Sequence, residues 1–120
     1  NWAPDADNEA SQKFVAAFEE KYGYVPGGYA MQAYDAAMLI DSAVASVGGD
    51  LSDKDAVRAA MEAADFTSLR GDFAFNSNHY PTQNFYQLSV EEREDGQWAT
   101  ATGELVFENY GDNFAGECSM

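Results

Sequence analysis

Apolar residues recur at helical spacing near the start of the chain. Phe14, Phe18 and Tyr22 follow one another at steps of four residues. This spacing puts their side chains on one face and predicts a helix over residues 8–22. The charged residues of the stretch are expected on the outer face: Lys13, Glu19 and Glu20. Gly23 follows at once and supplies the helix stop.

A second predicted helix is apolar around most of its circumference. It follows the loop Val25-Pro26-Gly27-Gly28 and runs from Tyr29 to about Val47. Alanines surround its larger side chains, which are Met38, Leu39, Ile40 and Val44. A helix without a polar face is typical of the interior of a larger body. In a short chain it leaves an exposed apolar patch, so we expect this segment to self-associate when isolated.

A third, shorter helix is predicted after Gly48-Gly49-Asp50. Ser52 and Asp55, three residues apart, resemble a capping box at its start. One face is lined by small and apolar residues at helical spacing, namely Val57, Ala60, Met61 and Ala64. The helical part of the chain is therefore expected to occupy residues 1–65.

After Asp65 the pattern changes from helical to alternating, which predicts strands over residues 66–120. Phe73 and Phe75 share one side, and a second alternating set consists of Tyr86, Leu88 and Val90. Asp95-Gly96 is a hairpin signal between strands expected near residues 85–93 and 97–102. Leu105-Val106-Phe107 either extends this pairing or forms a further short strand. Read as a whole protein, three helices followed by antiparallel strands would be an α+β fold.

The charge of the chain excludes one large class of partners. Its 21 acidic and 6 basic residues give a formal net charge of −15, with no basic stripe that could follow a phosphate backbone. We therefore expect no nucleic-acid partner. The acidity fits solubility, or adaptation to salty surroundings. Hydrophobic residues at 46% exclude an acidic disordered tail. No apolar run is long enough to span a membrane, and any signal peptide would lie upstream of Asn1.

Candidate catalytic and metal-binding residues are few. His79, the one histidine, sits in Asn78-His79-Tyr80-Pro81, which favours a surface turn over a catalytic base. The single Cys118 is expected to pack near the end of the chain or to pair with a cysteine outside it. A calcium loop from Asp5 fails, because alanine stands at its sixth and twelfth places. We expect no enzyme activity, no metal and no cofactor.

Two stretches together resemble a known family. One runs from Tyr22-Gly-Tyr-Val-Pro-Gly-Gly-Tyr29 to Tyr34-Asp35-Ala36, and the other is Arg70-Gly-Asp-Phe-Ala-Phe75 followed by Asn78-His79-Tyr80-Pro81. Their order and spacing resemble the C-terminal third of solute-binding proteins of branched-chain amino-acid-type ABC transporters. The resemblance implies an α/β fold, the two-lobed type I periplasmic binding fold, of which residues 1–120 would be a C-terminal fragment.

The resemblance also implies a ligand site at the start of the second helix. The family position that matches Tyr29 often carries an aromatic residue lining the cleft, and Ala30, Met31 and Gln32 are expected to share the site. Free backbone N–H groups at that helix end favour an anionic ligand group. The alternative is that Tyr29 packs against the preceding helix. Asp35, an acid in an apolar helix, is expected to bridge backbone groups, because a buried acid must be paired.

These features predict an extracytoplasmic, periplasmic or extracellular, solute-binding component of an ABC importer. Its expected ligand is a small carboxylate such as a branched-chain amino acid or an aromatic acid, captured by hinge closure, and its expected partner is the membrane permease. Two alternatives remain open from the sequence: a ligand-sensing regulatory domain of the same fold, and a free-standing acidic interaction domain.

Overall fold

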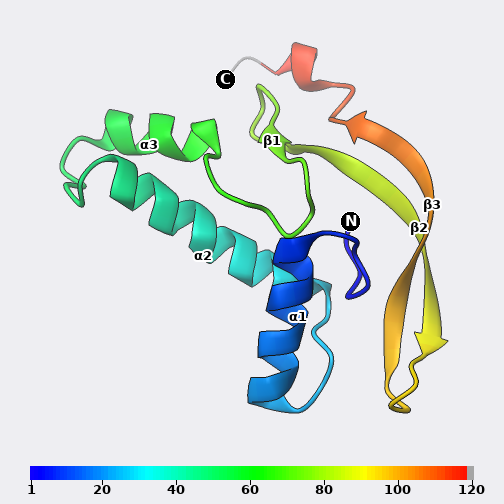
Figure 1. The fold of residues 1–120 in the computed structure, drawn as a ribbon. Coiled ribbons are helices and arrows are strands. Elements are labelled where there is room, and N and C mark those ends of the chain that lie inside the picture. Colours follow the sequence, from blue (N-terminus) through cyan, green and yellow to red (C-terminus); the bar gives the residue numbers. More distant parts are fainter. Residues whose placement is uncertain (119–120) are drawn as a thin grey trace.

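The structure, a computed structural model, describes residues 1–118 as three helices followed by antiparallel strands (Figure 1). The predicted order of elements is confirmed. In chain order the elements are α1 (Glu9–Tyr22), α2 (Gly28–Ser46), α3 (Lys54–Ala63), β1 (Ala74–Phe75), β2 (Pro81–Glu92), β3 (Trp98–Tyr110) and a 3₁₀ turn, η1 (Ala115–Glu117).

Helix α1 begins and ends where the sequence indicates. The Asn8 side chain accepts a hydrogen bond from the Ser11 N–H and caps the N-terminus, and Gly23 ends the helix in the left-handed conformation (φ 74°). The prediction that Glu19 faces away from the protein is wrong. Its carboxylate pairs with Arg93 at the far end of β2, so α1 is tied to the strand hairpin.

Helices α2 and α3 contact each other and run in roughly opposite directions, and a short loop joins them (Figure 1). The start of α3 differs from the prediction by one residue. Asp53, rather than Ser52, caps it by accepting hydrogen bonds from the N–H groups of Asp55 and Ala56. An aspartate is as good an N-cap as a serine. The Ser42 hydroxyl of α2 donates to the Asp65 carbonyl just beyond α3.

The three strands form a sheet in the order β1-β2-β3, with both pairings antiparallel. The hairpin predicted at Asp95-Gly96 is confirmed: the Arg93 N–H donates to the Gln97 carbonyl, and Gly96 has a φ of 80°. Both long strands exceed their predicted lengths. Leu105-Val106-Phe107 extends the pairing, with Phe107 opposite Phe85.

The core lies where α1 and α2 meet the N-terminal segment and the segment between α3 and β1. Its buried residues are Trp2, Phe14, Met31 and Leu69. The Trp2 indole N–H donates to the Ser11 hydroxyl, which in turn donates to the Leu69 carbonyl at 2.6 Å. These bonds satisfy polar groups inside the core, as burial requires.

Away from this core many large apolar side chains are exposed. On α2, Ile40 is 52% exposed, and on the hairpin Trp98 is 65% exposed. Cys118 is also exposed, so the expectation that it packs within the chain is wrong, while pairing outside the chain stays untested. In residues 1–118, no helix is both long enough and apolar enough to cross a bilayer.

Candidate functional site

The N-terminus of α2 carries backbone donors that no side chain caps. Gly27 is the N-cap residue and has no side chain to accept a hydrogen bond. Its carbonyl accepts from the N–H groups of Ala30 and Met31. The N–H groups of Gly28 and Tyr29 precede these and have no partner within the helix, and the helix dipole favours negative charge at this end.

The four residues predicted as ligand contacts divide into two kinds. Tyr29 is 89% exposed, so it does not pack on the preceding helix within this chain. Gln32 is exposed as well. Ala30 is half-buried against the core, and Met31 is a core residue with only 2% of its surface exposed. A ligand contact for any of the four stays a prediction.

An open hollow of about 410 Å³ lies beside this helix end, and we call it the Arg70 hollow. Its apolar wall comes from Trp2, Met31 and Pro81, and its polar side chains are those of Gln32, Arg70 and Gln83. The remaining lining residues are Asn1 and Gly28. Two predicted site residues, Met31 and Gln32, therefore line it, whereas Tyr29 and Ala30 do not.

The acid predicted to bridge backbone groups holds this region together. Asp35 is 5% exposed, and its carboxylate accepts from the Leu69 N–H at 2.9 Å and from the Ser68 hydroxyl at 2.6 Å. The Arg70 Nε lies 3.7 Å from its second oxygen, so the two side chains form an ion pair. The prediction for Asp35 is confirmed.

Arg70 enters the site from the segment between α3 and β1. Its side chain is 16% exposed, its Nη1 donates to the Gln83 Oε1 at 3.4 Å, and its guanidinium lies over the Phe73 ring. Its positive charge reaches into the hollow.

The sequence alone did not indicate Arg70 or Gln83 as site residues. One available signal was the rarity of cations, since only 6 of 120 residues are lysine or arginine. The approach of Gln83 depends on long-range folding, which local spacing does not reveal.

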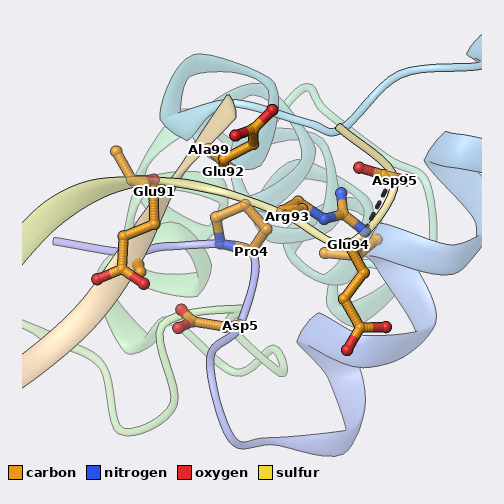
Figure 2. Close-up of a pocket in the computed structure, with 11 residues that line it drawn as sticks. Pro4, Asp5, Glu91, Glu92, Arg93, Glu94, Asp95 and Ala99 are labelled. Atoms are coloured by element: carbon orange, nitrogen blue, oxygen red, sulfur yellow. Dashed lines mark ion pairs between the residues drawn. The ribbon is translucent and has the colours of Figure 1, made fainter. Parts of the chain in front are cut away.

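A second hollow, of about 630 Å³, lies at the tip of the hairpin and is acidic (Figure 2). It is lined by Pro4, Asp5, Val15, residues 91–95 and residues 99–101. Figure 2 shows the carboxylates of Glu91, Glu92 and Glu94 pointing in different directions rather than at one centre. Within residues 1–118, no three acidic, histidine or cysteine side chains form a group that could hold a metal ion.

His79 occupies a surface turn, as predicted. It has a φ of 62° between β1 and β2, and its Nε2 lies 3.2 Å from the Glu62 carboxylate of α3. Its side chain is 48% exposed and lines none of the hollows described above.

Comparison with known proteins places the chain in a family. A model of the family described as periplasmic binding protein matches residues 1–97. The chain belongs to the periplasmic binding protein family. No curated protein sequence matched it.

Solved structures similar to the chain are solute-binding proteins of ABC transporters. One is a solute-binding protein from R. palustris in complex with benzoate, 36% identical, covering 93% of this chain and 30% of that chain with a TM-score of 0.80. A second, from Rhodopseudomonas palustris BisB5 in complex with 3,4-dihydroxybenzoic acid, is 26% identical, covering 98% of this chain and 31% of that one with a TM-score of 0.79.

A third similar structure is an ABC transporter substrate-binding protein from Sphaerobacter thermophilus. It is 26% identical, with a TM-score of 0.79, and the match covers 91% of this chain and 30% of that chain. This chain therefore spans about a third of the length of the structures it matches. The predicted fold, three helices and then antiparallel strands of an α/β periplasmic binding protein, is confirmed.

Proposed function

We propose that these 120 residues form the C-terminal segment of an extracytoplasmic solute-binding protein that delivers a small carboxylate to an ABC permease. The observation that carries the proposal is the family match over residues 1–97 together with 36% identity to a solute-binding protein. Within this segment, residues 1–65 supply the helical part and residues 66–120 the strands.

An aromatic carboxylate is the ligand we favour. Two of the similar structures hold benzoate and 3,4-dihydroxybenzoic acid. The exposed Tyr29 ring offers this chain a flat apolar surface on which an aromatic ring can stack. A branched-chain amino acid is the second candidate, and it would need an acidic partner for its ammonium group.

Hinge closure is the mechanism we propose for capture. A binding protein shifts toward its closed form when the ligand makes contacts that exist only after two lobes meet. Tyr29 suits such a contact. Its side chain leaves the first turn of α2 and is open to whatever approaches that end of the helix.

Replacing Tyr29 with alanine in the full-length protein tests the proposal. We expect the dissociation constant for benzoate to rise about tenfold or more, because aromatic contact area worth about 1–3 kcal/mol is lost. The free energy of unfolding should barely change, since the ring is 89% exposed. Calorimetric titration and urea unfolding give the two quantities.

Tyr80→Ala is the matched control, because Tyr80 is also an exposed tyrosine and does not line the Arg70 hollow. It should leave affinity unchanged. Loss of folding stability with unchanged affinity in Tyr29→Ala would identify Tyr29 as a packing residue. Failure of the unaltered protein to bind any benzoate-type acid or branched-chain amino acid would contradict the function.

A further inference from the structure

We propose that the Arg70 guanidinium is the group that binds the ligand carboxylate and sets the preference for an acid without an ammonium group. This inference rests on the proposed function and deepens it.

The guanidinium has donors to spare. It carries five N–H groups, and within residues 1–118 its side chain makes one hydrogen bond, the 3.4 Å bond to Gln83. No buried side-chain nitrogen or oxygen in that part of the chain lacks a partner. The nitrogens of Arg70 without an acceptor are therefore not sealed inside the protein. Arg70 lines the Arg70 hollow and also a neighbouring hollow of about 320 Å³, to which Asp7 and Asp72 contribute.

Asp35 fixes Arg70 without using up its donors. The Nε to oxygen distance of 3.7 Å is beyond hydrogen-bond length, and both carboxylate oxygens already accept from Ser68 and Leu69. Asp35 thus lowers the free-energy cost of burying the Arg70 cation and leaves the N–H groups of its planar guanidinium available to a ligand. The guanidinium matches the two oxygens of a carboxylate.

The charge of the residues that line the hollow also favours an anionic ligand. The chain has 21 acidic residues, yet none of the side chains that line the Arg70 hollow is acidic. An anion entering it meets Arg70 and the amide side chains of Gln32 and Gln83. Among the residues that line it, an amino-acid ammonium would meet no carboxylate, and it would lie beside the Arg70 guanidinium, whose charge Asp35 balances in part.

The size of the hollow suits a small acid. Its volume of about 410 Å³ lies within the range usual for small-molecule sites. Trp2, Met31 and Pro81 also line the hollow, but Trp2 and Met31 belong to the buried core and present little surface to it. The polar groups of Gln32, Arg70 and Gln83 are therefore its main contacts.

Paired titrations of benzoate and its neutral analogue benzamide test the inference in the full-length protein. We expect Arg70→Gln to weaken benzoate about tenfold or more while benzamide changes little, because only the charged ligand loses a charge-assisted hydrogen bond. A merely structural role for Arg70 would weaken both ligands equally. Arg58→Gln is the control, since Arg58 is an exposed cation on α3.

A second variant covers the case in which Arg70→Gln fails to fold. Gln32→Glu places a negative charge in the hollow at an exposed position, so it should also weaken benzoate selectively, whereas Gln12→Glu on α1 should not. Unchanged benzoate affinity in Gln32→Glu, or in folded Arg70→Gln, overturns this inference and leaves the proposed function standing. If the unaltered protein binds neither carboxylates nor amino acids, the proposed function itself fails.

Discussion

The helical junction buries its large apolar side chains, whereas the strand hairpin exposes its own. In the junction, which consists of Trp2, Phe14, Met31 and Leu69, every member is at most 9% exposed. In the hairpin of β2 and β3, apolar side chains of similar size stand in the open. Val90, Trp98, Val106 and Phe107 are all more than 50% exposed.

The stability of this segment by itself therefore comes mainly from the helical junction. Large exposed apolar patches on a protein usually mark sites of contact with another surface, and the hairpin carries such a patch. In the similar structures, this chain corresponds to about 30% of the full length. Under the proposed function, the remainder of the full-length solute-binding protein covers the hairpin. Self-association of the isolated segment stays a prediction.

The largest expected effect comes from emptying the junction. Phe14 contacts the rings of Trp2, Phe18 and Tyr34, with centroids 6.1, 5.8 and 4.9 Å away. Phe14→Ala should lower the free energy of unfolding by about 3–5 kcal/mol, because it leaves a cavity in the only large core of the described residues. Urea unfolding followed by circular dichroism measures this.

Phe107→Ala is the matched change in the hairpin of the 120-residue chain. Its side chain is already 51% exposed, so the cost should be about 1 kcal/mol. Equal losses for the two variants would remove the distinction between the two regions.

A somewhat smaller loss is expected when the polar centre beside the junction is broken. Asp35→Ala leaves the Leu69 N–H, the Ser68 hydroxyl and the Arg70 charge without their acceptor, which should cost about 3 kcal/mol. Asp41→Ala, one exposed acid further along α2, should cost less than about 0.5 kcal/mol. Thermal unfolding of both variants decides the matter, and similar midpoints would show that the network contributes little.

The smallest expected effect concerns the cap of α3. Removing the Asp53 side chain should destabilise the protein by about 1 kcal/mol, because two N–H groups lose their acceptor. Ser52→Ala should be nearly neutral. The reverse ranking in chemical unfolding would restore the capping box that the sequence suggested.

Local patterns in the sequence predicted the elements well. Phe14, Phe18 and Tyr22 marked α1, and the turn at Asp95-Gly96 needed only a glycine with a positive φ, which is a property of that residue itself. Asp35 was predictable because an acid among alanines has few ways to be satisfied. In each case neighbouring residues carry the physical cause.

The rest depends on partners far away in the sequence. β2 begins at Pro81 because residues 74–75 and 107–110 pair with it, not because residues 81–84 alternate in polarity. Trp2 looked unremarkable in the sequence, yet its burial follows from Ser11 and Leu69. The Arg70 hollow likewise unites residues from the start, the middle and the strand region of the chain, so no local window contains it.

The junction and the hairpin each contain one tryptophan, so the fluorescence of the protein reports on both regions. The chain has two tryptophans: Trp2 is 5% exposed, with its indole N–H bonded to Ser11, and Trp98 is 65% exposed at the start of β3. A buried indole emits at shorter wavelength and resists soluble quenchers such as iodide, whereas an exposed one emits toward the red and is quenched readily. Each region therefore carries one emitter of its own, and covering the hairpin would shift the emission of Trp98 while leaving that of Trp2 in place.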